Sequence, residues 1–289
     1  MEITDLKDIH DIINDLDGKM RGRVKRNDLL YQIWFRGQKN YNWELTPGIF
    51  RDDDNFTIES KYIELFKREY PSLNDICSTE VDWLSHMQHY GIPTRLLDWS
   101  ENILIALFFA TESTDENNDG KLSILNAYEL NKFATTTAES QGVYSEKDME
   151  ILHRVLLAQG HFNKADLKGS MKYIIEKMGY DSDYLSYIDD KEFDFNVKSP
   201  VAFFPKLISD RMKYQSSVFT IHGGFINDYN SLESFEGVLL NYKIPNNKKL
   251  KIRKQLFNFG VHEGSIYPEL ENQSKYLKFK VSNGMFTLR

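Results

Sequence analysis

An unbroken apolar run directly behind a polar segment is the feature that most constrains this chain. Residues 103–110 read ILIALFFA, without one polar side chain. A helix that is apolar on every side must lie inside the protein. We therefore expect a buried helix over residues 100–112, with Ser100 or Asp98 as its N-cap. The run is much shorter than the roughly 20 residues needed to cross a bilayer, so we expect no membrane contact.

The segment before this run is rich in groups that bind ligands. Residues 88–100 read QHYGIPTRLLDWS. A helix N-terminus offers free N–H groups and partial positive charge to an anion, arginine adds a bidentate cation, and tryptophan adds a stacking face. We expect a nucleotide-binding site made by Gln88, His89, Thr94, Arg95, Asp98, Trp99 and Ser100. The alternative is that Arg95 simply pairs with Asp98 and that Trp99 covers the core.

Another candidate site residue closes a predicted strand. Residues 29–37 read LLYQIWFRG, rich in aromatic and branched side chains, which predicts a buried strand. An arginine there is costly to bury without a partner. Arg36, followed by Gly37, is therefore either half of a structural salt bridge, with Asp98 as a candidate partner, or a cation aimed into a cleft.

Two later segments hold further polar groups. Residues 211–222 read RMKYQSSVFTIH and bring Gln215 to the start of a strand, where polar side chains usually face solvent. Residues 262–271 read HEGSIYPELE. Here Glu263 and Glu269 are candidates for a catalytic acid or base, and the alternative is a solvated loop.

The cysteine and histidine content argues against internal disulfides and against a metal site. The chain has 289 residues with a single cysteine, so no internal disulfide forms. Its first residues, MEITDLKDIH, contain no apolar leader, and we expect a cytoplasmic protein. The seven histidines are scattered and show no zinc-binding spacing, so we expect no metal site.

Charge is unevenly distributed along the chain, whose formal net charge is −7. Basic residues gather in segments 19–26 and 248–254, whereas residues 181–195 are strongly acidic. Such segregation predicts one face for a polyanion such as RNA or DNA and another for a partner protein. Each cluster taken alone is more simply a solvated surface.

Periodicity and capping residues divide the chain into helices and strands. Thr4, Thr57 and Thr79 are candidate N-caps, and Gly91 suits the position after a helix end. We expect one α+β domain over residues 1–289, with an N-terminal helix and basic loop (1–28) and a helical insertion (130–200). The expected helices are 4–17, 57–70, 79–90, 100–112 and 246–259, and the expected extended pieces are 29–37, 41–51, 121–128, 200–204, 214–222, 237–244, 276–281 and 285–289.

Four blocks, in this order, resemble the FRG domain. They are WFRGQ with LTPGIFR, QHYGIPTRLLDWSENILIALFFAT, RMKYQSSVFTIH and IYPELE. The first two are the most specific, and the likeness extends from about residue 30 to residue 271. FRG domains occur largely in bacteria and phage-related contexts and have no assigned activity, so this resemblance implies a setting but no reaction.

A more distant resemblance is to ADP-ribosyltransferases. In that superfamily a first-strand Y-R-G grips NAD, and FRG at residues 35–37 is similar to it. PTRLLDWSENILIALFFA resembles the next landmark, without its Ser-Thr-Ser. The last landmark, a strand beginning Q/E-x-E, resembles YQSSVF, in which serines occupy the glutamate positions. The resemblance implies mostly antiparallel sheets in a split arrangement, with NAD as co-substrate on Arg36 and Gly37.

This second resemblance also implies roles for other candidates. Gln215 would hold the ribose, and Glu263 or Glu269 would arrive from the following loop to stabilise the oxocarbenium ion. Otherwise, the chain binds NAD without the usual chemistry. Arg36 and the N-terminus of the apolar helix would hold the pyrophosphate, and Trp99 or Tyr90 would stack on the nicotinamide.

These features lead to one hypothesis and two alternatives. The hypothesis is a bacterial NAD-dependent ADP-ribosyltransferase, a toxin in a toxin–antitoxin or phage-defence system, that modifies RNA or DNA. Segments 19–26 and 248–254 would contact the nucleic acid, and segment 181–195 an antitoxin or inhibitor protein. The alternatives are a non-catalytic nucleotide- or nucleic-acid-binding module and a protein-interaction module.

Overall fold

The computed structural model describes residues 2–51, 58–112, 117–134, 200–222, 231–267 and 269–284. Most of the predicted helical insertion, residues 135–199, lies outside the described residues. The acidic segment 181–195 and the predicted strand 285–289 lie outside them as well.

Within the described residues, six strands form one sheet in the order β6-β7-β4-β3-β5-β8, and all its neighbouring pairs are antiparallel. Two very short strands, β1 and β2, form a separate antiparallel pair. The predicted α+β class with mostly antiparallel strands is confirmed. The bounds are β1 (Lys25–Arg26), β2 (Leu29–Leu30), β3 (Ile33–Gln38), β4 (Leu96–Ser100), β5 (Gly120–Asn126), β6 (Val201–Phe203), β7 (Ser217–Ile221) and β8 (Leu239–Ile244).

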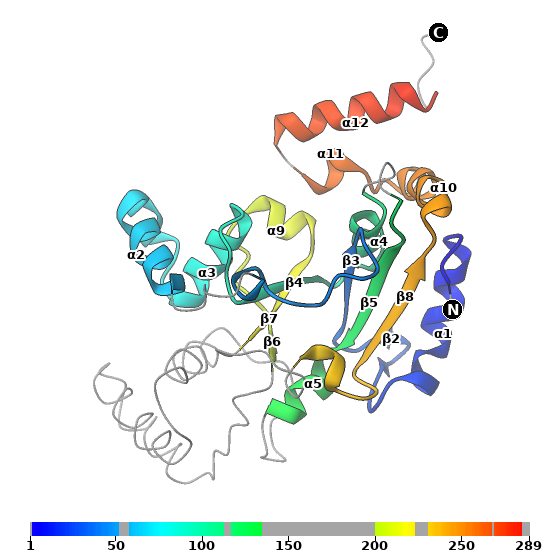
Figure 1. Ribbon diagram of the computed structural model, residues 1–289, viewed down its shortest axis with the longest axis horizontal. Coiled ribbons are helices and arrows are strands. Elements are labelled where there is room, and N and C mark those ends of the chain that lie inside the picture. Colours follow the sequence, from blue (N-terminus) through cyan, green and yellow to red (C-terminus); the bar gives the residue numbers. More distant parts are fainter. Residues whose placement is uncertain are drawn as a thin grey trace.

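Helices pack around this sheet (Figure 1). Helices α2 and α3 lie on the side of the sheet that β4, β7 and β6 form, and α1 and α10 lie beside β8. The bounds are α1 (Lys7–Lys19), α2 (Glu59–Glu69), α3 (Glu80–His89), α4 (Ile103–Ala110), α5 (Ala127–Ala134), α9 (Asp210–Tyr214), α10 (Asn246–Asn258), α11 (Glu263–Ile266) and α12 (Leu270–Ser282).

The sheet face toward α4 carries much of the apolar core. Phe35, Leu122 and Ile124 pack there with side chains of α1, α4 and α10. Leu107 and Phe108 of α4 have no exposed surface. The prediction that the apolar run forms a buried helix is confirmed, because neighbours enclose this helix on several sides.

A glycine lets α4 approach β3 closely. A Cβ atom on Gly37 would lie 1.7 Å from the carbonyl oxygen of Ala106 and 2.6 Å from the backbone nitrogen of Ala110. Both are backbone atoms of α4, so no side-chain rotation would relieve the contact. Gly37 is therefore required for packing, whatever it does for a ligand.

Strands β3 and β4 are paired over a much shorter length than their neighbours. Their register consists of one pair, Phe35 with Ser100, whereas β3 pairs with β5 along its whole length. Beyond Phe35 the sheet opens. Strands β3, β5 and β8 form one half, and β4, β7 and β6 form the other. The gap between the two halves brings side chains of both together.

The residues before the apolar helix form a strand and not the mouth of that helix. Helix α4 begins only at Ile103, and its N-cap is Asn102, whose Oδ1 accepts a hydrogen bond from the nitrogen of Leu104 at 2.9 Å. The prediction that Ser100 or Asp98 caps this helix is therefore wrong.

Burial on both faces explains why this strand was not predicted. Leu97 and Trp99 pack on one side of the sheet and Leu96 on the other. A central strand covered on both faces loses the alternation that identifies strands in a sequence. Its apolar residues therefore merge with those of α4.

The predicted strand over residues 276–281 is also wrong, because these residues lie in α12. The rings of Tyr276 and Phe279 both lie near Phe257 of α10, with centroids 5.8 and 6.3 Å away. Side chains three residues apart share one face of a helix but opposite faces of a strand. Packing against α10 therefore selects the helix.

The opening helix and the second extended piece differ from prediction in detail. Helix α1 begins after Thr4 and runs through Gly18 to Lys19. The carboxylate of Asp8, and not the Thr4 side chain, accepts the first backbone N–H groups. Residues 41–51 contain a short 3₁₀-helix (Gly48–Phe50) and no strand.

Helices α2, α3 and α10 agree with the predicted helices within a few residues. Thr79 caps α3, with its Oγ1 accepting a hydrogen bond from the nitrogen of Asp82 at 3.1 Å. Gly91 follows that helix at φ +81°, a conformation that suits glycine. Thr57 lies outside the described residues.

Candidate functional site

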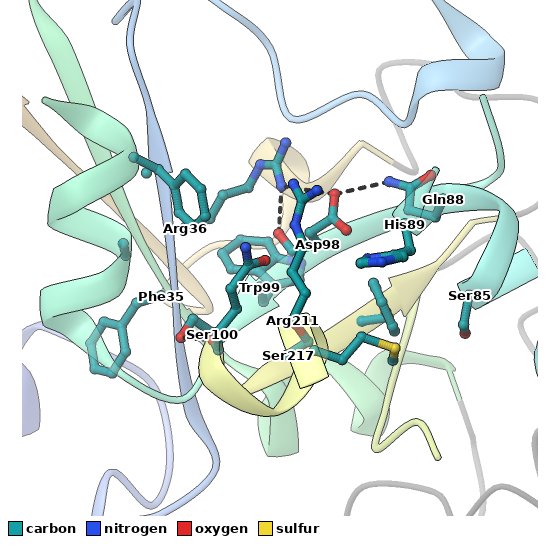
Figure 2. A pocket seen from close by; sticks show the side chains of 16 residues that line it. Phe35, Arg36, Ser85, Gln88, His89, Asp98, Trp99, Ser100, Arg211 and Ser217 are labelled. Atoms are coloured by element: carbon teal, nitrogen blue, oxygen red, sulfur yellow. Dashed lines mark hydrogen bonds and ion pairs between the residues drawn. The ribbon is translucent and has the colours of Figure 1, made fainter. Parts of the chain in front are cut away.

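A cavity of about 240 Å³ lies where β3 and β4 separate (Figure 2). Strands β3, β4 and β7 and helices α3, α4 and α9 form its walls. The residues are far apart in the sequence, but the split of the sheet brings them together. Of the residues predicted from sequence, the cavity is lined by Arg36, Gly37, Gln88, His89, Asp98, Trp99, Ser100 and Gln215.

Arg36 occupies the gap between the two strands. Its Nη1 donates to the backbone oxygen of Asp98 at 2.5 Å and lies 3.7 Å from the Asp98 carboxylate. The guanidinium thus takes a carbonyl that the β3 backbone would pair with if the ladder continued. Burial lowers the pKa of Arg36 and Asp98 opposes that shift, and the guanidinium stays charged. Arg36 therefore forms the predicted salt bridge with Asp98 and also faces the cavity.

A chain of hydrogen bonds fixes the carboxylate of Asp98. Thr94 Oγ1 donates to Oε1 of Gln88 at 2.7 Å, and Nε2 of Gln88 donates to Oδ2 of Asp98 at 2.9 Å. Thr94 is fully buried and does not line the cavity, so it acts through Gln88 and not on a ligand. The Asp98 side chain remains half exposed. Its carboxylate is thus held in place yet accessible.

A second guanidinium, that of Arg211 in α9, points to the same part of the cavity (Figure 2). It lies 4.8 Å from the ring centroid of Tyr267, whose hydroxyl donates to Oε1 of Glu112 at 3.2 Å. Burial raises the pKa of Tyr267, so this ring remains a neutral phenol. Two guanidinium groups at one cavity suit an anion with several oxygens, such as a pyrophosphate.

His89 supplies a neutral imidazole to the cavity. Burial lowers the pKa of His89, and the charge of Arg211 lowers it further, against the opposite effect of Glu269 and Asp98. The ring is therefore uncharged near pH 7 and able to accept a proton.

Gln215 ties the end of α9 to β4. Its backbone oxygen accepts a hydrogen bond from Ser100 Oγ at 2.7 Å, while its side chain lines the cavity. Gln215 thus lines the same cavity as Arg36 and Asp98.

Arg95 does not reach the cavity. Its backbone nitrogen donates to Oε1 of Glu59 at 2.8 Å, its Nε donates to Oε2 at 2.5 Å, and both residues are buried. The structure gives Arg95 a structural ion pair instead of the predicted contact with a ligand. The alternative pairing of Arg95 with Asp98 is also wrong, because Glu59 from α2 takes its place.

The two glutamates predicted as catalytic also lie outside the cavity lining. Glu263 is largely buried in an ion pair with Arg253, where it joins α11 to α10. Glu269 is exposed and affects only the pKa of His89. Within the described part of the chain, Asp98 is the carboxylate residue that lines this cavity.

Comparison with protein-family models finds the FRG domain over residues 31–119. This chain contains an FRG domain. The family resemblance drawn from WFRGQ and PTRLLDW is thereby confirmed for the region from β3 to α4. Neither the comparison with curated proteins nor that with solved structures gives a match.

The FRG domain supplies only part of the cavity. Strands β3 and β4 and helices α3 and α4 fall within residues 31–119, whereas α9 and β7 follow it in the chain. Arg211 was not predicted as a site residue. Its spacing of four residues from Gln215, which places both on one helical face, is the signal that identifies it.

Some basic residues of segments 19–26 and 248–254 are engaged in internal contacts, whereas Arg21, Arg23 and Arg26 are exposed. Lys249 is fully buried and Arg253 is buried against α11, so neither offers its charge to a partner. Neutralisation of this kind reduces the surface potential that a polyanion would meet. The contacts are Lys249 with the backbone oxygen of Lys39, Arg253 with Glu263, Lys251 with Asp5, Lys19 with Asp15, and Lys25 with Asp17.

The described ranges contain no group of three or more His, Cys, Asp or Glu side chains placed to hold a metal ion. No helix in these ranges is long and apolar enough to cross a membrane. Cys77 is buried, and burial raises the pKa of its thiol to about 11, so it is not an activated nucleophile.

Proposed function

We propose that this FRG protein is an NAD-dependent ADP-ribosyltransferase whose dinucleotide binds in the Arg36 cavity. The observation that carries the proposal is the position of Arg36, a charged guanidinium in the gap of an antiparallel sheet. The more distant resemblance implies a split sheet and a first-strand arginine on NAD. Arg211, on the same cavity, adds a second cation for the pyrophosphate.

The size of the cavity implies that the dinucleotide is only partly enclosed. Its volume of about 240 Å³ is below the roughly 300–1,000 Å³ of typical small-molecule pockets. One end of NAD would therefore enter the cavity, and the remainder would lie across the mouth.

The transfer step requires a stabilised ribose cation and a base for the acceptor. The bond from ribose C1′ to the nicotinamide nitrogen breaks, and its electron pair leaves with neutral nicotinamide. Asp98 is the carboxylate available to stabilise the oxocarbenium character that develops. An acceptor hydroxyl or amine then bonds to C1′ and passes its proton to neutral His89. In this proposal Asp98 takes the role that the sequence assigned to Glu263 or Glu269.

The biological setting is part of the proposal. The acceptor is RNA or DNA, and the protein is a cytoplasmic bacterial toxin or phage-defence effector with a neutralising partner protein. What supports the setting is the FRG family, which occurs largely in bacterial and phage-related contexts. The exposed arginines of segment 19–26 are the basic side chains proposed to contact the nucleic acid, because Lys249 and Arg253 of segment 248–254 are buried.

A second candidate function, nucleotide binding without turnover, is favoured by the start of β7. Ser216 and Ser217 stand where the resemblance implies a glutamate. If Asp98 serves only to hold Arg36, the cavity would bind NAD and leave it intact.

Nicotinamide release from NAD tests the proposed activity. The purified protein, with and without RNA or single-stranded DNA, should release nicotinamide, and Arg36→Ala should lower the rate at least about a hundredfold, as expected for loss of a charged anchor. Arg68→Ala is the matched control, because Arg68 is exposed on α2 and pairs only with Glu69. Release by Arg36→Ala at the wild-type rate would remove Arg36 from the site. NAD binding without release would support the second candidate.

A further inference from the structure

A second, larger cavity of about 470 Å³ lies on the other face of the sheet. Its walls come from the loop after β3, from β5 and β8, and from the end of β7. The residues that line it include Tyr41, Trp43, Lys121, His222, Glu233 and Asn241. No role is given to this cavity by the NAD proposal.

Strand register places this cavity next to Arg36. Arg36 pairs with Ser123, and Ser123 pairs with Asn241, so the three side chains share the face opposite α4. The charge of Arg36 also lowers the pKa of both His222 and Lys121. The gap in the sheet thus has one cavity on each face, and Arg36 lies between them.

His222 presents an unused hydrogen-bond donor to the second cavity. Trp99 Nε1 donates to Thr220 Oγ1 at 3.1 Å, and that hydroxyl lies 3.0 Å from His222 Nε2. We assign the hydroxyl hydrogen to Nε2, which leaves the ring hydrogen on Nδ1. Burial lowers the pKa of His222 to about 3, so the ring is neutral. His222 is 1% exposed, and its Nδ1 has no partner among the described residues.

Further donors and a carboxylate stand around the same cavity. Lys121 is buried with its ammonium group bonded to the backbone oxygen of Trp43. Ser123 Oγ donates to Oδ1 of Asn241 at 2.6 Å, which leaves the Asn241 amide hydrogens for another acceptor. Glu233 accepts from the nitrogen of Leu45 at 3.2 Å with one carboxylate oxygen. A cavity wall with both hydrogen-bond donors and acceptors matches a ligand whose ring edge also carries donors and acceptors.

Two exposed aromatic side chains, Tyr41 and Trp43, stand at this cavity. Trp43 is 45% exposed and Tyr41 37%, whereas Trp34, Trp83 and Trp99 are at most 3% exposed. Lys39 lies over the Trp43 ring and Lys121 over the Tyr41 ring, at 5.6 and 5.8 Å from the centroids. Exposed aromatic faces stack on nucleobases without requiring one base in particular.

From this arrangement we infer that the second cavity binds a nucleobase. The negative charge of Glu233 beside Lys121 disfavours a phosphate group as the ligand. The exposed aromatic faces, together with a wall of hydrogen-bond donors and acceptors, fit a neutral heterocycle. The base comes from one of two sources, an unpaired position in a nucleic-acid strand or the adenine of NAD. The inference stands without the transferase proposal, because base binding requires no turnover.

Tryptophan fluorescence tests base binding directly, because Trp43 is the exposed tryptophan of the chain. Adenosine monophosphate and a short single-stranded oligoribonucleotide should each quench its emission, and ribose 5-phosphate, which lacks a base, should not. Equilibrium dialysis of the same ligands should show about tenfold weaker binding by Trp43→Ala, which removes the stacking face, and near-normal binding by Trp43→Phe. Tyr70→Ala, which truncates an exposed aromatic residue near α2, is the matched control and should bind normally.

Two further variants report on the polar wall. Glu233→Gln and Asn241→Ala alter the edge that reads the base and should each weaken binding several-fold, with circular dichroism used to verify folding. Absence of binding by both base-containing ligands, or wild-type binding by Trp43→Ala and Glu233→Gln together, would overturn the inference.

Competition distinguishes the two sources of the base. If the cavity takes a nucleic-acid base, the oligoribonucleotide will still bind when NAD is saturating, and Arg36→Ala will retain that binding. If it takes adenine of the dinucleotide, NAD and ADP-ribose will displace adenosine monophosphate and the oligoribonucleotide. Either result supports a base site, and neither depends on whether NAD is cleaved.

Discussion

Arg36 lies on the central strand β3 and Arg95 directly before the central strand β4, and the two side chains have different surroundings. Arg95 is enclosed with Glu59, its partner from a helix 36 positions earlier in the chain. Arg36 is anchored by Asp98 but retains a face toward a cavity. The sequence predicts a charged residue near a buried segment in both cases. It does not reveal which partner arrives, because Glu59 sits in an ordinary amphipathic helix.

The buried pair gives a stability prediction for a single residue. Glu59→Gln keeps the shape of the side chain but leaves the charge of Arg95 without its carboxylate. We expect a loss of about 3–5 kcal/mol in the free energy of unfolding, because removing one partner of a buried ion pair is costly. Urea denaturation measures this loss, with Glu69→Gln on the exposed surface of α2 as the control. A Glu59→Gln protein as stable as wild type would contradict the assigned pairing.

His222 gives a prediction for the pH dependence of stability. Its pKa falls from 6.5 to about 3 in the folded protein, so between these values the unfolded chain binds a proton that the native protein does not. The contribution of His222 to the free energy of unfolding is therefore complete above about pH 6.5. It decreases as the pH falls below that value, by up to about 1.4 kcal/mol per pH unit.

The matched variant isolates this contribution from those of His86 and His89, whose pKa values are also lowered by burial. His222→Gln cannot titrate, so its midpoint of unfolding should fall less than that of wild type between about pH 7.5 and about pH 5. Parallel pH profiles for the two proteins would show that His222 is not buried in the neutral form.

At the scale of elements, hydrophobic periodicity predicted the helices that bury one face. It failed for a strand that is buried on both faces of the sheet. Thr79 caps α3 as predicted, and helices α2, α3 and α10 follow the apolar spacing that the sequence displays. Strand β4 does not, because Leu96, Leu97 and Trp99 are apolar toward both sides of the sheet. Helix α12 was missed for a different reason: its contacts with Phe257 come from another element and leave no local signal.

The contact between β3 and α4 gives the prediction at this scale. Gly37→Ala puts a Cβ atom against the backbone of Ala106, so strand and helix must separate. We expect the free energy of unfolding to fall by at least about 1–3 kcal/mol, which a lower midpoint of unfolding would show. Gly18→Ala in α1 is the matched control, because its Cβ meets nothing within 4 Å and should stabilise the helix by about 0.5–1 kcal/mol. Equal stability of Gly37→Ala and wild type would contradict the close packing.

At the scale of the whole molecule, the candidate site belongs to the junction between the two halves of one sheet. The sequence grouped Gln88, His89, Asp98 and Trp99 correctly because they are close together in the chain. Their meeting with Arg36 was a hypothesis, and the structure places them around one cavity. The second cavity was not predicted, because its walls come from separate loops and strands whose meeting only the complete topology fixes.

The same junction links the FRG domain to the rest of the chain. Residues 31–119 supply Arg36 and Asp98, whereas Arg211 and Gln215 come from the later α9 region. The FRG domain alone therefore lacks one wall of the Arg36 cavity. A ligand that fills it would contact both parts and stabilise the full chain, by about 2.7 kcal/mol at a hundredfold excess over its dissociation constant.

Isothermal titration of NAD into the full-length protein tests most directly whether the gap between β3 and β4 is a dinucleotide site. We predict saturable one-to-one binding by wild type and by Arg68→Ala, and at least about tenfold weaker binding by Arg36→Ala, consistent with loss of a charge-assisted hydrogen bond worth about 1.5–3 kcal/mol. No heat of binding for wild type, or equal affinity of Arg36→Ala and wild type, would contradict it.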